Sequence, residues 1–253
     1  MSETTTSLII FAIVFGAALL GMILQRVLPE RHLTEDSRKA VTVGIGLIAT
    51  LTALVLGLLV GSVKGSFDAQ NDVLRRIAAN VVLLDRVMAQ YGPETKDARA
   101  QLRQMLLLKL AASGKGLQDL QDIDESNQAT LGFERMQDML RRLPTTDPVQ
   151  SQLQVRAVQV SQDIAQMRWL LMESSGSSIP GPFLVMLVFW LGVIFMSFGL
   201  FSPTNGTVLA VLFVCAMSVT GAIFLILEMD SPLAGMVRLS DAPLVNAAKR
   251  LGP

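Results

Sequence analysis

The sequence has a single cysteine, Cys215, and a single histidine, His32, so the side chains that most often bind metals are almost absent. Cys215 has no second cysteine with which to form a disulfide, and it lies inside an apolar run. His32 stands between Glu30 and Glu35 in a polar turn, and we interpret it as a surface residue because metal sites usually need several such ligands. The sequence therefore predicts no metal site and no cofactor.

Motifs that mark catalytic sites are also missing. The chain has no glycine-rich phosphate-binding loop, no His-Glu-x-x-His pattern and no Gly-x-Ser-x-Gly pattern. The 21 Lys and Arg residues balance the 21 Asp and Glu residues, and the basic residues are dispersed instead of forming a patch. We therefore expect neither an enzyme nor a protein that binds nucleic acid.

What the sequence does have is four long apolar runs, which account for much of its 51% apolar content. A helix of about 20 residues crosses the hydrocarbon core of a bilayer, and backbone groups inside a bilayer must satisfy one another's hydrogen bonds. Short polar turns join the first run to the second and the third to the fourth, so we expect each pair to be antiparallel neighbours. The runs cover residues 8–28, 40–63, 183–200 and 207–227.

The predicted fold class is an all-α polytopic membrane protein, with four transmembrane helices in two hairpins and an inserted helical domain. The first run is longer than a signal peptide and lacks its positive charge, so we expect it to be retained as a span. The predicted divisions are a first hairpin at residues 1–65, a membrane-proximal helical domain at 66–179, a second hairpin at 180–230 and a C-terminal tail at 231–253.

Two seams of apolar residues, spaced alternately by three and four, run through the helical block. The first predicts that the second span continues out of the membrane up to Gly92-Pro93, and the second predicts a helix that starts at Asp147-Pro148. Between them we expect a loop at residues 113–127 and a short helix that stops at Pro144. The two helices can pack on each other within one chain, or one seam can pack between subunits. The seams are Leu74, Ile77, Val81, Leu84, Met88 and Tyr91, and Leu153, Ala157, Val160, Ile164, Met167 and Leu171.

The second span carries a stripe of small or polar side chains, and we expect leucines and Val43 on the opposite face. The stripe can be a packing face, with Thr50 bonded back to its own helix, because small residues let helices approach closely. Alternatively it can line a pore, with Lys64 at the mouth attracting anions, once several copies face a common axis. The stripe, which we keep as a unit below, consists of Gly46, Thr50, Ala53, Gly57, Gly61 and Lys64.

The fourth span ends in Glu228 and Asp230, two acidic residues at the negative end of the helix dipole. Such residues are expected to be paired, and the basic candidates at a similar membrane depth are Lys64, Arg168 and Arg76. The predicted role is an ion pair at the membrane interface; the alternative is gating through a bound divalent cation.

Three local features make the chain resemble the bacterial bestrophin-like membrane proteins over nearly its whole length. They are the turn at residues 28–33 (Leu-Pro-Glu-Arg-His-Leu), the glycine-rich second span running into Phe67-Asp68, and the segment at residues 228–235 (Glu-Met-Asp-Ser-Pro-Leu-Ala-Gly). Where that family often has Arg before the proline and Phe after it, this chain has Ser231 and Leu233. The resemblance implies homo-oligomers and ion conduction by a ring of second spans.

The expected function is thus an oligomeric ion channel with the second span lining the pore. The alternative is a non-conducting scaffold or signalling protein whose helical domain binds a partner. The expected partners are the lipid bilayer, other copies of the chain and inorganic ions. Positive-residue counts lean towards a bacterial inner membrane protein with the helical domain and both termini in the cytoplasm.

Overall fold

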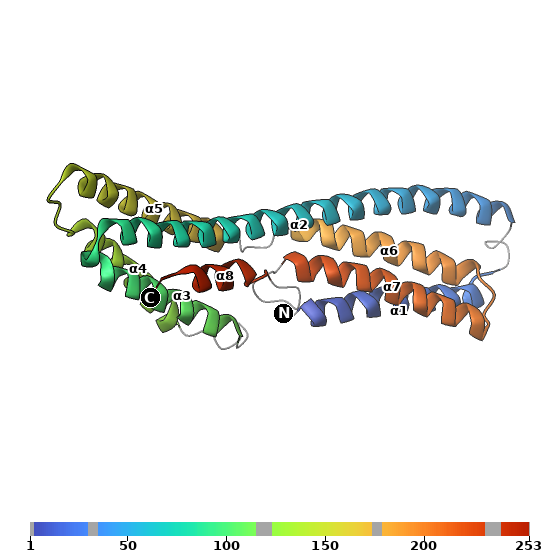
Figure 1. Ribbon diagram of the computed structural model, residues 1–253. Coiled ribbons are helices and arrows are strands. Elements are labelled where there is room, and N and C mark those ends of the chain that lie inside the picture. The colour runs from blue at the N-terminus through green and yellow to red at the C-terminus, as the bar shows by residue number, and fades with distance from the viewer. Residues whose placement is uncertain (1–2, 30–34, 115–122, 174–178, 231–238, 253) are drawn as a thin grey trace. The chain divides into compact units, whose positions relative to one another are not determined.

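A computed structural model describes residues 3–29, 35–114, 123–173, 179–230 and 239–252. Within these ranges every regular element is a helix, as predicted (Figure 1). His32 and the Ser231–Gly235 part of the family-like segment lie outside the described residues. The helices are α1 (Glu3–Val27), α2 (Glu35–Tyr91), the short 3-10 helix η2 (Pro93–Thr95), α3 (Lys96–Gly114), α4 (Ile123–Arg141), α5 (Pro148–Glu173), α6 (Gly181–Phe201), α7 (Gly206–Asp230) and α8 (Ala242–Arg250).

Four of these helices are long and apolar enough to span a membrane, namely α1, α2, α6 and α7. The chain divides into two compact units: one consists of residues 1–66 and 177–231, and the other of residues 67–176 and 232–253. We call them the membrane unit and the helical unit. The single helix α2 has its first half in one and its second half in the other.

In the membrane unit, α1 packs against α6 and α7. Phe11 and Phe15 of α1 both meet the ring of Phe213 on α7 edge-on, with 5.5 Å between ring centroids in each pair. Among the described residues the main packing partners of α1 are α6 and α7 and not its hairpin partner α2, so the prediction that the spans of a hairpin pack as neighbours is wrong for the first hairpin. Short turns fix the antiparallel direction of consecutive helices, but packing partners depend on which surfaces fit.

The closest fit is between α1 and α6, at Gly21 and Gly199. A Cβ atom on Gly21 would lie 2.9 Å from the backbone N of Leu200, and one on Gly199 would lie 3.0 Å from the backbone N of Met22. The two backbones touch, so neither position has room for a side chain. Small residues commonly allow such approach between membrane helices.

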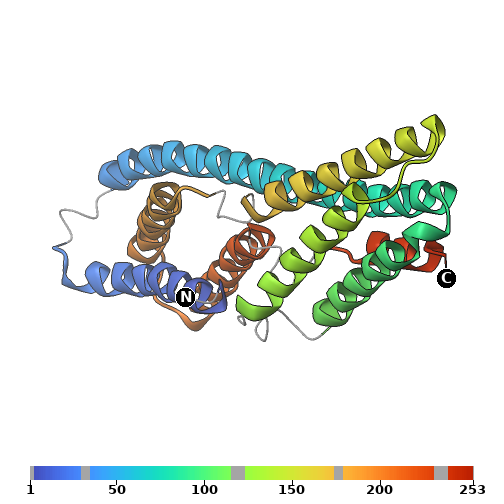
Figure 2. The same ribbon diagram turned by 90° about the vertical axis from the view of Figure 1, so that its left-hand side faces the viewer.

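The helical unit has one apolar core to which α2, α3, α4, α5 and α8 all contribute. Leu84 and Met88 of the α2 seam are fully buried in it, together with Ala157, Val160 and Ile164 of the α5 seam. Both seams are thus buried within one chain, in a core that α3, α4 and α8 share; direct packing of α2 on α5 stays a prediction. Figures 1 and 2 both show α5 running back along the second half of α2.

The ends of these helices follow from local chemistry. Gly92, which ends α2, has a φ of 136°, a conformation that side chains other than glycine rarely adopt. Asp147 caps α5, since its carboxylate accepts a hydrogen bond of 2.8 Å from the backbone N–H of Gln150. Both ends were predicted, whereas α4 begins at Ile123, within the predicted loop, and α8 lies in the predicted tail.

Candidate functional site

All six stripe residues lie on the membrane half of α2, and all six are exposed. A Cβ atom added to Gly46, Gly57 or Gly61 would meet nothing within 4 Å. The stripe is therefore not a packing face within the chain, and its cover must come from lipid, water or other copies.

Thr50 makes the backbone hydrogen bond that the sequence predicted. Its hydroxyl donates to the carbonyl of Gly46 at 2.9 Å. The bond uses the hydroxyl proton and leaves the oxygen lone pairs directed away from the helix as acceptors. Thr50 can therefore sit in a membrane span without an unsatisfied donor and still accept a hydrogen bond from water.

The packed face of α2 is a third face, made by Thr52, Leu59 and Val63. The leucine face is as exposed as the stripe, with Leu47 at 65% and Leu58 at 66% relative exposure. At about 100° per residue, the stripe and the leucine face are centred about 80° apart, and each lies about 140° from the packed face. The prediction that the leucines stand opposite the stripe is therefore wrong, because the surface opposite both is the packed one.

The membrane half of α2 has few partners inside the chain compared with the other spans. In its most apolar 18-residue window 6% of the residues are buried, against 28% in each of α1, α6 and α7. The leucine face suits lipid, because leucine is as apolar as lipid tails. Glycine, alanine and threonine present little apolar surface to lipid. The stripe is therefore the part of α2 that most needs contact with water or with another copy.

The acidic end of the fourth span is buried, as expected for paired acids. Glu228 is 4% exposed and Asp230 is 8% exposed, and both belong to the last turn of α7. Glu228, Asp230 and Lys64 each take part in an interaction. Which basic residue pairs with Glu228, and which with Asp230, stays a prediction.

The two arginines suggested as partners for these acids belong to the helical unit. Arg76 is exposed on α2. The Arg168 guanidinium lies over the ring of Phe133, 5.4 Å from its centroid, and burial lowers the pKa of Arg168 from its ordinary value. Their pairing with the α7 acids also stays a prediction.

A buried ion pair in the helical unit was missed from the sequence. Arg99 Nε donates to Asp85 Oδ1 at 2.7 Å and Arg99 Nη2 donates to Asp85 Oδ2 at 3.2 Å. The Asp85 side chain is 3% exposed, and the backbone N–H of Gly252 lies 3.4 Å from its Oδ2. The pair therefore joins α2, α3 and the segment after α8. A charged residue between apolar seam positions was the only signal in the sequence.

We expect Asp85→Ala to destabilise the helical unit by about 3–5 kcal/mol, because it leaves the Arg99 charge partly buried without its partner. Thermal unfolding of the purified protein, followed by circular dichroism, measures the loss. Asp72→Ala is the matched control: Asp72 lies 3.8 Å from Arg75, and both side chains are well exposed, so the expected loss is below about 1 kcal/mol. Equal losses from the two variants would contradict a structural role for the buried pair.

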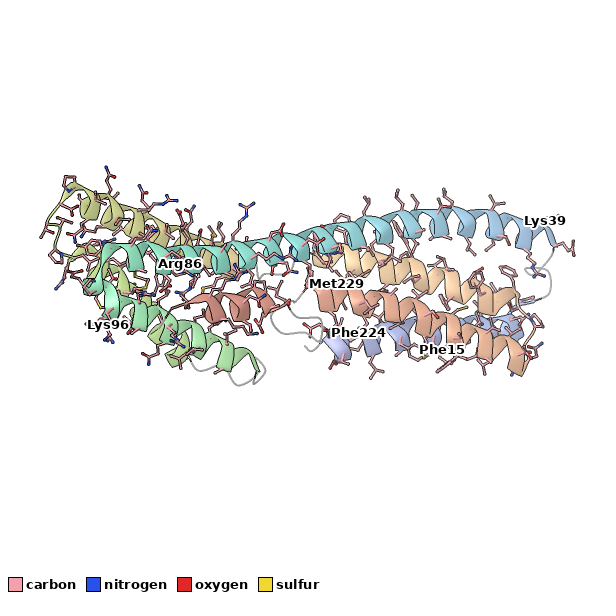
Figure 3. The ribbon with its side chains drawn as sticks, viewed as in Figure 1. Phe15, Lys39, Arg86, Lys96, Phe224 and Met229 are labelled. Carbon is pink, nitrogen blue, oxygen red and sulfur yellow. The ribbon has the colours of Figure 1, made fainter. Side chains whose placement is uncertain are left out.

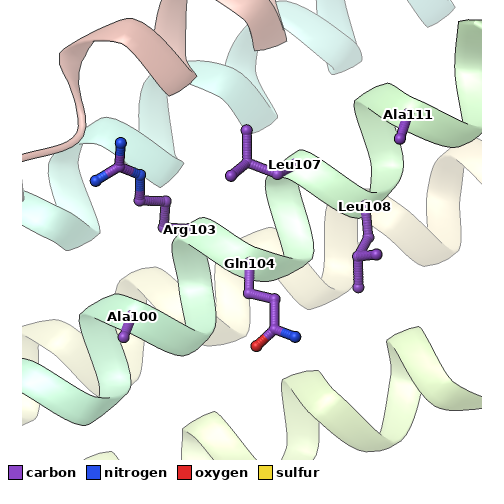
Figure 4. Close-up of a pocket in the computed structure, with 6 residues that line it drawn as sticks. All are labelled: Ala100, Arg103, Gln104, Leu107, Leu108 and Ala111. Atoms are coloured by element: carbon purple, nitrogen blue, oxygen red, sulfur yellow. The ribbon is translucent and has the colours of Figure 1, made fainter.

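A hollow on α3 is the other candidate surface (Figure 4). Its lining residues all come from this one helix, and Leu107 and Leu108 point to different sides of it. The lining brings together no acid–base pair and no group of metal ligands. The lining residues are Ala100, Arg103, Gln104, Leu107, Leu108 and Ala111.

Comparisons with known proteins identify the family and the fold of the chain. The family model described as Bestrophin-like domain matches residues 12–244. A crystal structure of a bacterial bestrophin homolog from Klebsiella pneumoniae, carrying a mutation, superposes with a TM-score of 0.63 at 12% sequence identity. The match covers 96% of this chain and 97% of that chain. No curated protein matches the sequence.

Proposed function

Because the chain belongs to the bestrophin-like family, we propose that it assembles into a homo-oligomeric ion channel in which α2 of each copy lines the pore. The observation that carries the proposal is the open stripe on α2. Its six residues are exposed within the chain, although they lie on a helix long and apolar enough to span a membrane. We propose no enzymatic role.

The proposal requires an oligomer. A stripe on one helix gives an ion no enclosed path, whereas several copies arranged about one axis would enclose one. Cyclic assembly is common among homo-oligomers, and it would direct the same face of every α2 towards the axis. The leucine face, about 80° away, would then lie against lipid or a neighbouring copy.

The alternative is a scaffold in which copies pack their stripes shut. The charge at the end of the stripe favours the channel. Lys64 is exposed at the helical-unit end of the stripe and takes part in an interaction, and closing identical stripes on one another would move several charged Lys64 side chains from water into a dry contact. A water-filled pore mouth keeps these groups hydrated, which is the ordinary requirement of charge at membrane depth.

The expected selectivity is low, with a lean towards anions. Lys39 lies on the same side of α2 as the stripe, at the opposite end of the span from Lys64 (Figure 3). Asp68 follows Lys64 by one helical turn and is also exposed, so this mouth carries charges of both signs. A ring of lysines attracts anions, and a ring of aspartates one turn further moderates the preference.

We further propose that the protein resides in a bacterial inner membrane, with the helical unit and both termini in the cytoplasm. The support is the excess of Lys and Arg on that side of the spans. Protease protection of tags fused to each terminus checks the arrangement. Termini on opposite sides of the membrane would contradict four spans.

We expect Lys64→Glu to shift the channel towards cations. The change would turn a mixed Lys–Asp mouth into one that carries only carboxylates, and acidic rings favour cations. Flux measured in liposomes under chloride and potassium gradients reads the shift as a change in the reversal potential. Lys109→Glu, at an exposed position on α3, makes the same charge change outside the spans and is expected to leave the preference unchanged.

The same experiment can contradict the proposal. An intact oligomer with the same flux for wild-type protein, Lys64→Glu and empty liposomes would mean that the protein does not conduct ions. The scaffold would then be the better account.

A further inference from the structure

Two arginines of the helical unit stand apart from the other basic residues. Of the Lys and Arg residues that the structure describes, all are exposed except Arg99 and Arg168. Arg99 is balanced by the buried carboxylate of Asp85. Arg168, on α5, is partly buried as well. Removing a charge from water is costly unless an opposite charge and hydrogen bonds replace the water, so Arg168 needs a counter-charge as Arg99 does.

The contact that the structure gives Arg168 is aromatic. Its guanidinium lies over the ring of Phe133 on α4, 5.4 Å from the ring centroid. Among the described residues of the helical unit, none forms an ion pair or a hydrogen bond with this side chain. The ring attracts the cation through its π electrons but has no oxygen atom, so it gives the five N–H groups of the guanidinium no ordinary acceptor.

The two helices that meet at this point bring no carboxylate to it. The nearest acids on α5, Asp163 and Glu173, are exposed and lie about 140° around the helix from Arg168. A pairing acid would stand three or four residues away. These neighbours of Arg168 on α5, and the corresponding neighbours of Phe133 on α4, include no acid. They are Ile164, Ala165, Leu171 and Met172 on α5, and Ala129, Thr130, Met136 and Gln137 on α4.

The two arginines also differ in the direction of their pKa shifts. The hydrogen bond from Asp85 raises the pKa of Arg99, whereas burial lowers the pKa of Arg168. A guanidinium nevertheless keeps its proton in a protein. Arg168 therefore cannot avoid the cost of burial by becoming neutral, and an anion is what would balance it.

The contact between α4 and α5 holds this position in place. Gln137 Nε2 donates to Ser161 Oγ at 3.4 Å, about one turn along α4 from Phe133 and about two turns along α5 from Arg168. Ser161 is fully buried, and Phe133 belongs to the core of the helical unit. The ring under the guanidinium is thus fixed by the fold, and a group that is already positioned loses less freedom when it binds a ligand.

We propose that Arg168 is the recognition residue of an oxyanion site at the contact between α4 and α5, with a phosphate or carboxylate group as its ligand. The planar fork of a guanidinium donates two parallel hydrogen bonds to two oxygens of such a group, so an oxyanion suits it better than chloride. Phe133 supports the guanidinium, and the anion supplies the charge and the acceptors that the two helices lack. The site does not depend on whether the protein conducts ions.

Thermal unfolding of the full-length protein, in a maltoside detergent and Tris chloride, tests the site by circular dichroism. Sodium phosphate or sodium acetate is expected to raise the unfolding temperature more than sodium chloride of equal ionic strength does, because a ligand of the folded state stabilises it. The larger of the two rises identifies the preferred oxyanion. Arg168→Lys keeps the charge without the fork, and its apparent affinity should fall roughly tenfold.

Arg168→Met removes the charge and keeps an apolar side chain over Phe133, so the rise specific to oxyanions should disappear. Arg156→Met makes the same change at an exposed position on α5 and should keep that rise. In chloride alone, Arg168→Met should unfold at or above the wild-type temperature, because it removes an unbalanced charge.

Two results would overturn the site. Equal responses to phosphate and acetate in wild-type protein and Arg168→Met would show a general salt effect or no effect at all. A marked fall in the unfolding temperature of Arg168→Met in chloride alone would show that a carboxylate of the protein itself already balances the arginine.

Discussion

Gly57→Leu is expected to remove most of the ion flux through the reconstituted protein while the oligomer stays intact. Gly57 lies in the middle of the stripe, and nothing stands within 4 Å of where its Cβ would be. In a pore, one substitution places a leucine from every copy at the same level of the axis. The lumen accepts the added volume, and conduction falls because the path becomes narrow and apolar.

Liposome flux together with native mass spectrometry measures both properties at once. Gly44→Leu is the matched control, because Gly44 lies on the same helix, off the stripe, and also has nothing within 4 Å of an added Cβ. If the stripes instead pack on one another, Gly57→Leu would force the helices apart at a cost of about 1–3 kcal/mol per site. A weakened oligomer would therefore contradict the pore.

Gly199→Leu is expected to prevent the membrane unit from folding correctly. Its Cβ would lie 3.0 Å from both the carbonyl carbon of Ala18 and the backbone N of Met22. These atoms belong to the backbone of α1 and cannot change rotamer, so the two helices would have to separate. The cost is expected to exceed the usual overpacking penalty of about 1–3 kcal/mol.

The yield of monodisperse protein and its unfolding temperature in mild detergent measure this effect. Gly16→Leu is the matched control, because Gly16 lies on α1 with nothing within 4 Å of an added Cβ. Its yield and unfolding temperature should stay near those of the wild type. If Gly199→Leu unfolds at the wild-type temperature, the close crossing of α1 and α6 does not hold the unit together.

Much of the fold could be predicted because hydropathy and helix signals act locally. The four spans follow from apolar length alone, and the α2 seam predicted the continuation of that helix to Tyr91. Proline after a capping residue predicted the start of α5. The helix α8 was missed although Pro243 stands in its first turn, because nine residues are too few for a clear apolar period.

Packing partners were harder to predict because they depend on surfaces that meet only in three dimensions. Gly21 follows Ala17 by four residues, a spacing that does signal a close helix contact. The sequence analysis instead considered close helix packing for the longer stripe of small residues on α2. In the structure the contact is on α1, and the row on α2 stands open.

The candidate site could be predicted only in part. Residue types and helical spacing identified the stripe, and Thr50 bonds to Gly46 as expected. Helical spacing puts the leucine face only about 80° from the stripe, so placing the leucines opposite it was an error; what spacing could not indicate is which face packs inside the chain. Only the burial of Thr52, Leu59 and Val63 distinguishes the three faces.

The most direct test of the pore is whether water reaches the stripe in the assembled protein. Cys215 is the only native cysteine, so Cys215→Ala provides a background without thiols. Thr50→Cys and Leu51→Cys then place one thiol at the same depth on the stripe and on the leucine face. We predict that a charged, membrane-impermeant methanethiosulfonate reagent modifies Thr50→Cys and reduces its flux, and that it leaves Leu51→Cys unmodified. If Thr50→Cys in an intact oligomer fails to react, or reacts no faster than Leu51→Cys, the stripe does not face a water-filled path.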